Sequence, residues 1–200
     1  MGDLWLIAGL GNPGPRYTGT RHNAGFWLLE RLSRKIGVAL ASDRKVHGSI
    51  ARGRIADRDV LLLAPETWMN ESGRSVQAAA AYYRINPEQL VVAHDELDLP
   101  PGVARLKFGG GHGGHNGLRS LFSHLGTRDF WRLRLGIGHP GQAEQVTPWV
   151  LSRPSADDES RILQAVDQAV EVLPELLSGS SGRAMQALNS RERGTDGNAL

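Results

Sequence analysis

Apolar residues along the chain fall into short continuous runs and longer segments with helical spacing. The continuous runs cover residues 4–8, 59–64 and 90–93, and each has the length of a strand that is buried on both faces. Helical spacing follows the first run over residues 22–36 and the second over residues 71–84. Because strand and helix alternate, the sequence predicts an α/β fold: a single-domain three-layer sandwich with a mixed, mostly parallel sheet and helices on both faces.

Period-two alternation predicts further strands that have only one buried face. It is weak over residues 43–56, which we expect at the margin of the sheet, and clear over residues 104–108 and 131–135. Further helices are expected over residues 116–125, over residues 155–178 with a kink or early end at Pro174, and in a last segment up to about Asn189.

Length and composition favour one domain without disulfides. The 200 residues suffice for a hydrophobic core, and we expect one domain over residues 1–190 and a frayed tail over residues 191–200. The absence of cysteine excludes disulfides and thiolate metal sites. No apolar run approaches the roughly 20 residues that span a bilayer, and the N-terminus is too polar for a signal peptide. We therefore expect a cytoplasmic protein with no membrane partner, and a monomer, because no exposed apolar stripe requires a partner chain.

Basic residues are concentrated in one part of the chain. The formal net charge is +2, yet residues 101–140 hold six basic side chains and one acidic side chain. Such a local excess fits an anionic partner. Basic side chains on exposed strands also protect a sheet edge from pairing, and this alternative stays open here. In the two alternating strands of the segment, the cations that share a face are Arg105, Lys107, Arg132 and Arg134.

A glycine-rich turn separates the first strand from the first helix. Gly9, Gly11 and Gly14 match the G-x-G-x-x-G pattern of dinucleotide-binding loops. In that pattern the helix begins at the turn and offers free N–H groups, but Pro13 and Pro15 remove two of these groups. No acidic residue closes a second strand about 20 positions later. We therefore favour a rigid turn that presents a polar side chain over a dinucleotide site.

Polar side chains follow three of the predicted strands where each strand ends. Because the carboxyl ends of parallel strands meet at one edge of a sheet, we expect these side chains to converge. No cysteine is present and no serine lies in a G-x-S-x-G turn, so water is the expected nucleophile. The side chains are Asn12 and His22 after the first strand, Trp68 and Asn70 after the second, Asp95 after the third, and His115 and Asn116 from a glycine-rich loop over residues 109–117.

The residue types at these strand ends suit water activation. His22 fits a general base, because a position near a helix N-terminus disfavours the imidazolium and leaves a nitrogen free to accept a proton. Asp95 would hold the other ring nitrogen and fix the tautomer. The amides of Asn12 and Asn70 would orient the water or donate to a developing oxyanion. Taken singly, His22 is equally typical of an ordinary helix start, and Asp95 is also typical of a turn at the end of a strand.

A metal centre is the competing chemistry at this edge. His112, His115, Asp95, Glu96 and Asp98 supply enough imidazole and carboxylate ligands. However, the H-x-x-H pattern lies in a glycine loop and lacks the rigid i, i+4 helical spacing of metalloproteases. We therefore expect no metal ligand among them.

The motifs together resemble those of bacterial peptidyl-tRNA hydrolases. The resemblance covers roughly residues 4–190 in unbroken order and rests on the segments G-L-G-N-P-G, T-R-H-N-A-G-F-W, T-W-M-N-E-S-G, H-D-E-L-D-L-P-P-G, G-G-G-H-G-G-H-N-G-L-R-S and R-L-G-I-G-H-P. It implies a single-domain α/β enzyme of translation that hydrolyses the ester between a peptide and the 3′ end of tRNA and so releases tRNA. It implies no metal or cofactor.

The resemblance also assigns roles to residues of this chain. It implies that His22 is the catalytic histidine, that Asp95 supports it, and that Asn12 favours N-blocked over free aminoacyl groups. Trp68 stands where relatives often carry phenylalanine or tyrosine, and Arg105 where they often carry lysine, so phosphate would be bound with different geometry. The implied substrate-binding residues are Tyr17, Trp68, Asn70, His115 and Asn116, and the implied tRNA phosphate-binding residues are Arg105, Lys107 and Arg134.

Two other classes of function remain as alternatives. A non-catalytic RNA-binding protein could use the same scaffold, but it would not need His22, Asp95 and the asparagines. A nucleotide-dependent oxidoreductase is disfavoured by the prolines in the glycine turn.

Overall fold

A seven-stranded mixed sheet runs through the molecule, of which the computed structural model describes residues 4–190. The strands are β1 (Trp5–Gly9), β2 (Ala41–Asp43), β3 (Gly48–Ile55), β4 (Arg58–Pro65), β5 (Leu90–Glu96), β6 (Ala104–Phe108) and β7 (Trp131–Gly136). Their order is β2-β3-β4-β1-β5-β7-β6. The central strands β4, β1, β5 and β7 are parallel, and antiparallel pairing adds β3 and β2 on one side and β6 on the other.

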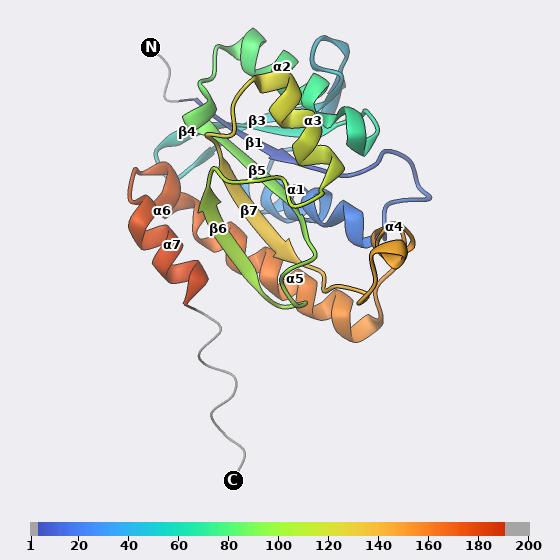
Figure 1. Cartoon of the computed structure of the whole chain (residues 1–200). Helices are drawn as coiled ribbons and strands as arrows, with labels where there is room; N and C mark the ends of the chain where they lie inside the picture. The colour runs from blue at the N-terminus through green and yellow to red at the C-terminus, as the bar shows by residue number, and fades with distance from the viewer. Residues whose placement is uncertain (1–3, 191–200) are drawn as a thin grey trace.

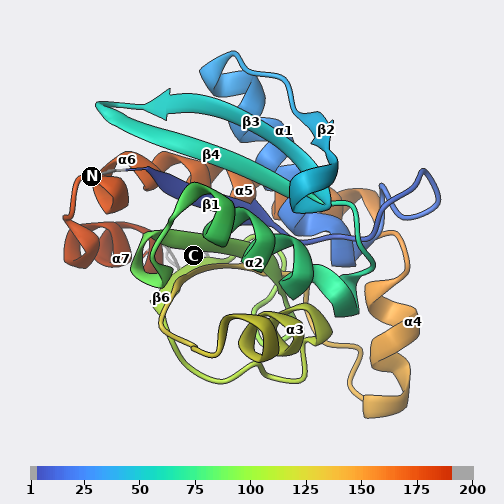
Figure 2. The same cartoon turned by 90° about the horizontal axis from the view of Figure 1, so that it is seen from above.

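Helices cover both faces of this sheet (Figures 1 and 2). The α-helices are α1 (Ala24–Ile36), α2 (Ser72–Tyr83), α3 (Asn116–Leu125), α4 (Val146–Val150), α5 (Ala156–Glu171), α6 (Leu173–Leu177) and α7 (Ser181–Asn189). Short 3-10 turns are η1 (Arg21–Asn23), η2 (Arg44–Val46), η3 (Met69–Glu71), η4 (Pro87–Gln89) and η5 (Ala143–Gln145). Residues of α1, α5, α6 and α7 pack into one core, and residues of α2 and α3 into the other. The predicted three-layer α/β fold is confirmed.

The continuous apolar runs form strands that are buried on both faces. In β5, Val91 and Ala93 face the core beneath α1 and α5, whereas Leu90 and Val92 face the core beneath α2 and α3. Alternate residues of a strand point to opposite faces, so a strand between two helical layers has no polar face. The predicted break near Pro174 is also present, because α5 ends at Glu171 and α6 begins at Leu173.

Close packing of α1 against the sheet determines where the first helix begins. A Cβ atom on Gly25 would collide with the main chain of Ala93 and Leu10, and one on Gly9 would collide with the carbonyl oxygen of Gly25. Only glycine permits this approach. The start of α1 therefore lies directly on the ends of β1 and β5, which carries the preceding turn η1 to the carboxyl edge of the sheet.

Two features differ from the sequence-based expectations or extend them. The helix α4 was not predicted, and it lies beside the carboxyl edge of the sheet (Figure 1). The basic face of β7 is only partly exposed, because Arg132 is 3% exposed beneath the glycine-rich loop. The tail predicted over residues 191–200 lies outside the described residues. No helix within residues 4–190 is long and apolar enough to cross a membrane.

Candidate active site

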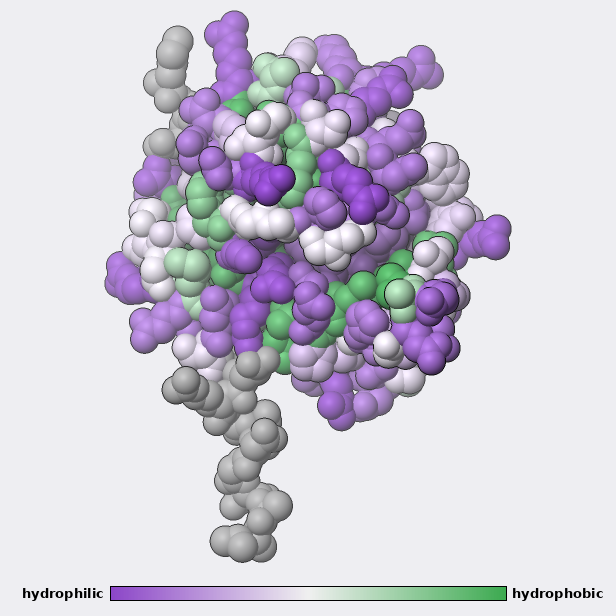
Figure 3. All heavy atoms as spheres, viewed as in Figure 1, coloured by the Kyte–Doolittle hydropathy of each residue, from purple (hydrophilic) through white to green (hydrophobic). Residues whose placement is uncertain are grey.

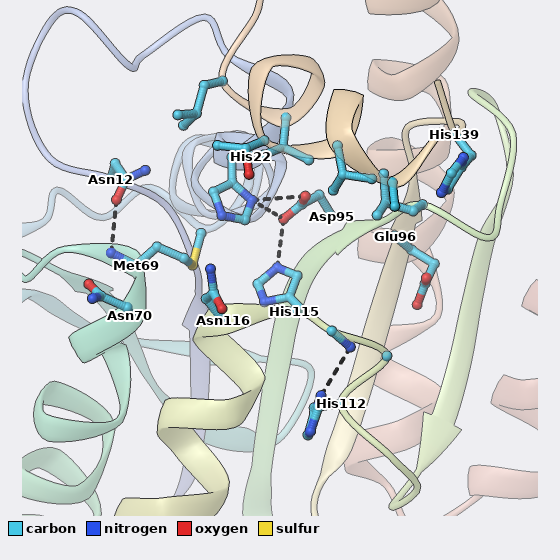
Figure 4. A pocket seen from close by; sticks show the side chains of 18 of the residues that line it. Asn12, His22, Met69, Asn70, Asp95, Glu96, His112, His115, Asn116 and His139 are labelled. Atoms are coloured by element: carbon cyan, nitrogen blue, oxygen red, sulfur yellow. Dashed lines mark hydrogen bonds and ion pairs between the residues drawn. The ribbon is translucent and has the colours of Figure 1, made fainter. Parts of the chain in front are cut away.

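A cavity of about 850 Å³ opens at the carboxyl edge of the sheet (Figure 4). The predicted residues from three strand ends meet there: Asn12, His22, Trp68, Asn70 and Asp95 all line it. The glycine-rich loop before α3 contributes a further part of the lining, and α4 closes another side with an apolar wall. Figure 3 shows apolar surface on the side of the molecule where α4 lies. The wall residues of α4 and the turn after it are Val146, Thr147, Val150 and Leu151, and the loop residues are His112, Gly113, Gly114, His115 and Asn116.

His22 and Asp95 form a buried pair at the centre of this cavity, as the sequence predicted. They lie 73 positions apart in the chain, yet Nδ1 of His22 is 3.0 Å from Oδ1 and 2.9 Å from Oδ2 of Asp95. An ionised carboxylate only accepts hydrogen bonds, so Nδ1 of His22 carries the proton and donates it. No described residue hydrogen-bonds to Nε2 of His22. That nitrogen keeps its lone pair on the cavity side of the ring.

His115 is a second hydrogen-bond donor to Asp95. Its Nε2 lies 2.7 Å from Oδ1 of Asp95, and its Nδ1 accepts the main-chain N–H groups of Gly117 at 3.1 Å and Leu118 at 3.3 Å. A ring nitrogen that accepts a hydrogen bond has no proton in the neutral imidazole, so the proton is on Nε2. His115 therefore caps α3, and Asn116 is the first helical residue.

The charges of this cluster stabilise one another. Burial alone would raise the pKa of Asp95, but His22 and His115 hold the pKa of this carboxyl well below its usual range. Burial alone would lower the pKa of His22, but the charge and hydrogen bond of Asp95 outweigh it and raise that pKa above 6.5. This direction is opposite to the one expected from the helix N-terminus alone. The adjacent carboxylate dominates because it is in direct contact with the ring.

The same hydrogen bonds argue against a metal centre. The ligand atoms of His22, Asp95 and His115 lie within 4.8 Å of one another, close enough to suggest a cation site. A cation there would need the lone pair of His115 Nε2, which carries a proton because Nδ1 is committed to α3. Two other residues considered as metal ligands are engaged in different contacts: Nδ1 of His112 accepts the N–H of Gly114, and Glu96 forms an ion pair with Arg134.

Asn12 joins the glycine turn to the loop after β4. Its side-chain oxygen accepts the main-chain N–H of Met69 at 2.8 Å (Figure 4). The Nδ2 group of Asn12 is therefore left as a donor beside the cavity. Asn23 fixes the main chain of the glycine turn at Asn12: its Oδ1 accepts the N–H of Asn12 at 2.9 Å and its Nδ2 donates to the carbonyl oxygen of Asn12 at 3.0 Å. This role of Asn23 has no signal in the sequence beyond its place next to His22.

The remaining predicted substrate residues lie around the mouth of the cavity. Asn70 and Asn116 are exposed and line it. The side chain of Trp68 is 52% exposed and meets Tyr17 edge-on, with ring centroids 5.7 Å apart. Tyr17 is not part of the cavity lining and contacts the site only through Trp68. This large exposed aromatic surface is available for stacking.

The four predicted cations do share one face of β6 and β7, but they are not equivalent. Arg105 pairs in register with Arg134, and Lys107 with Arg132. Arg132 is buried and donates to the carbonyl oxygens of Gly110 and Gly111, so it anchors the glycine-rich loop and does not reach solvent. This corrects the expectation of four converging surface charges.

Arg134 and Lys107 differ in their surroundings. Nε of Arg134 lies 2.9 Å from Oε2 of Glu96, the residue that follows Asp95 on β5. The pair is partly buried and fixes the orientation of the guanidinium group. Lys107 is exposed, and within residues 4–190 it has no ion-pair partner. Its positive charge therefore stays open to an anion in solution.

Sequence comparison assigns the chain to a family. The peptidyl-tRNA hydrolase family matches residues 6–196. The chain belongs to the peptidyl-tRNA hydrolase family. It is 55% identical over 189 residues to the peptidyl-tRNA hydrolase of Halorhodospira halophila, covering 94% of this chain and 97% of the relative. It is 51% identical over 189 residues to that of Coxiella burnetii, covering 94% of this chain and 99% of the relative.

A solved peptidyl-tRNA hydrolase has the same fold. The crystal structure of the enzyme from Acinetobacter baumannii superposes with a TM-score of 0.91 at 49% sequence identity, covering 95% of this chain and 96% of that chain. The family resemblance and the class of enzyme predicted from the motifs are thereby confirmed.

One buried residue next to this hydrolase site was missed at the sequence level. His94 is fully buried on the opposite face of β5, and its Nδ1 donates to the carbonyl oxygen of Asp95 at 2.8 Å. Its Nε2 is buried with no hydrogen-bond partner. Burial and the neighbouring His115 lower the pKa of His94 to about 3, so the ring stays neutral beside the Asp95 main chain. An apolar-strand position such as this gives no sequence signal for a polar role.

Proposed function

We propose that this enzyme hydrolyses the ester bond that joins a peptide, or an N-blocked aminoacyl group, to the 3′ oxygen of tRNA. The observation that carries the proposal is the buried His22–Asp95 pair, which leaves Nε2 of His22 facing a cavity with a lone pair. Family membership gives the class of reaction, and the geometry suits attack by water. The proposed enzyme is a monomer, since one chain supplies every residue that the proposal requires, and it is cytoplasmic, since its substrate arises in translation.

His22 is the general base in the first step. Nε2 takes a proton from water, and the water oxygen bonds to the ester carbonyl carbon to give a tetrahedral oxyanion. Asp95 stabilises the imidazolium that forms, because its carboxylate contacts the Nδ1–H group. The Nδ2 donors of Asn12 and Asn70 bind the oxyanion, and each such donor is typically worth about 3 kcal/mol of barrier.

His22 is the general acid in the second step. The tetrahedral intermediate collapses, the bond between the carbonyl carbon and the 3′ oxygen breaks, and Nε2 returns its proton to that oxygen. The products are a peptide with a free carboxylic acid, which then loses its proton to water, and tRNA with a free 3′ hydroxyl. Both steps use only water and side chains of this chain. His115 positions Asp95, because both of its ring nitrogens are engaged within the protein.

The tRNA is held outside the cavity. Arg105, Lys107 and Arg134 bind its backbone phosphates from the face of β6 and β7. Trp68, which has Tyr17 against its edge, stacks on an unpaired base at the 3′ end. Asn116 lines the cavity in which the ester binds. This arrangement is supported by charge and exposure, and it predicts affinity that falls with salt.

Hydrolysis of a purified N-acetyl-aminoacyl-tRNA, with and without a chelator, tests the proposal. We expect turnover in both conditions and a loss of about 10²- to 10⁴-fold in kcat for His22→Ala with little change in tRNA binding. His124→Gln, on α3 and away from the cavity, is the matched control. Binding without turnover by the unaltered chain would identify an RNA-binding protein instead, and wild-type turnover by His22→Ala would remove His22 from the base role.

A further inference from the structure

Arg21, the residue before His22, makes an unusual set of contacts on the side away from His22. It is 4% exposed, and its guanidinium carbon lies 3.6 Å from the centre of the Trp149 ring. Nη1 donates to Oγ of Ser152 at 2.7 Å and to the carbonyl oxygen of Arg153 at 3.0 Å. It also lies 3.4 Å from the carbonyl oxygens of Trp149 and Ser152. One side chain thus holds the end of α4 and the turn that follows it.

The main chain reinforces the same connection. The N–H of Arg21 donates to the carbonyl oxygen of Ser152 at 3.1 Å. Trp149 is itself fixed, because its Nε1 donates to the carbonyl oxygen of Gly138 at 2.9 Å. The turn η1, which carries His22, is therefore joined to α4 by both main chain and side chain, and α4 is joined to the segment after β7.

This connection joins two elements that line the cavity. His22 lines it from η1, and α4 forms its apolar wall with Val146 and Val150. A movement of α4 relative to η1 would change the distance between the base and any substrate seated against that wall. Misplacement by about 1 Å is enough to reduce turnover by about 100-fold.

A buried guanidinium group is an unfavourable choice if the only role of Arg21 is to stabilise the fold. Burial lowers the pKa of Arg21, so its surroundings disfavour the charge, and Asp158 offers only a distant partner at 3.9 Å. An apolar side chain of similar volume would fill such a gap without removing a cation from water. It would not provide directed hydrogen bonds to several main-chain carbonyl groups at once.

We propose that Arg21 is a positioning residue that fixes the distance between His22 and the α4 wall, and with it the placement of the substrate ester against Nε2 of His22. The proposal rests on the function proposed above. Arg31 provides the contrast: it links α1 to α5 through an exposed ion pair with Asp167 at 3.4 Å, far from the cavity lining.

Steady-state hydrolysis of N-acetyl-aminoacyl-tRNA by Arg21→Lys and Arg21→Ala tests the proposal at temperatures where circular dichroism shows both variants folded. We expect kcat to fall about 10- to 100-fold while KM and its salt dependence stay close to wild type. Guanidinium ion should restore kcat of Arg21→Ala, whereas sodium chloride at equal ionic strength should not. Arg31→Ala, the matched control, should keep wild-type kcat.

Several results would overturn this role. They are a kcat of folded Arg21→Lys within about twofold of wild type, an effect confined to KM, and a failure of guanidinium to restore kcat of Arg21→Ala. If the Arg21 variants do not fold, Ser152→Ala removes the 2.7 Å contact with Nη1 of Arg21, together with the hydrogen bond that Oγ of Ser152 donates to the carbonyl oxygen of Trp149 at 2.7 Å. We expect it to lower kcat about threefold, and an unchanged kcat would count against the proposal. Wild-type turnover by His22→Ala would instead refute the proposed function, whatever the Arg21 variants show.

Discussion

Nε2 of His115 lies 2.7 Å from Oδ1 of Asp95, while Nδ1 of the same ring caps α3. Asp95 is therefore held between two imidazoles, one of which is committed to a helix N-terminus. His22 is free to exchange a proton through its other nitrogen, whereas His115 is not. The two histidines have the same side chain and different roles because their second nitrogens meet different neighbours.

Substitution of His115 by asparagine separates the two functions of this ring. Asparagine is a good N-cap, so we expect the melting temperature of His115→Asn to stay near wild type. The shorter side chain does not reach Asp95, so kcat should fall about tenfold. His115→Ala should lose both functions and unfold at a lower temperature. Equal kcat in wild type and His115→Asn, measured with N-acetyl-aminoacyl-tRNA, would show that the Asp95 contact is not needed.

The pH dependence of hydrolysis should follow His22. Because Asp95 raises the pKa of His22 above 6.5, and the base must be neutral to accept a proton, kcat/KM should rise with pH through a pKa above 6.5 and then level off. In Asp95→Asn the carboxylate is lost and burial dominates, so the apparent pKa should move down while kcat falls by about 10²- to 10⁴-fold. An apparent pKa that stays in place in Asp95→Asn would assign the acid limb to another group.

The same pKa shift has a consequence for stability with the opposite direction in pH. The folded state binds a proton at His22 more tightly than the unfolded state does. Its stabilising contribution is therefore complete below pH 6.5 and is lost as the pH rises through the raised pKa. Activity and this part of the stability should thus change in opposite senses above pH 6.5, which thermal melts of wild type and His22→Asn can measure.

Removal of Lys107 should weaken RNA binding in a salt-dependent way. Lys107→Ala takes away an exposed charge without breaking an ion pair, so KM should rise and the slope of log KM against log salt should fall by about 1, with kcat almost unchanged. Arg134→Ala should cost more, since it also leaves Glu96 without its partner at 2.9 Å. A wild-type salt slope in Lys107→Ala would favour the edge-protecting interpretation of these basic strands.

The end of α7 protects the outer edge of the sheet. Oδ1 of Asn189 accepts the N–H of Leu106 at 2.9 Å, and Nδ2 donates to the carbonyl oxygen of Leu106 at 3.2 Å, so the amide occupies the place of a neighbouring strand. Asn189→Ala should lower the free energy of unfolding by about 1–2 kcal/mol and leave kcat unchanged. Gln186→Ala, exposed on the same helix, is the control. Equal urea midpoints for both variants would show that the amide contributes nothing.

The sequence was informative where one physical signal sufficed. Continuous apolar runs identified β1, β4 and β5, and the rule for parallel sheets then placed His22, Asn70 and Asp95 at one edge. Hydrophobic periodicity did not predict α4. This helix has only five residues, one of them a proline, and so is too short to show helical spacing of apolar residues. Periodicity also failed for Arg132, which occupies an alternating strand but is covered by a glycine loop from another part of the chain.

The amino-acid sequence by itself therefore determined most of the succession of strands and helices along the chain, α4 excepted, and the kinds of side chain delivered to the carboxyl edge, because both depend on neighbours a few positions away. Only the tertiary structure decided how those polar groups are used. It directs the amide oxygen of Asn12 to Met69, commits His115 to α3, and leaves Nε2 of His22 facing the cavity. Each outcome depends on a hydrogen-bond partner brought near by folding, and a polar side chain that has found its partner is no longer available for substrate.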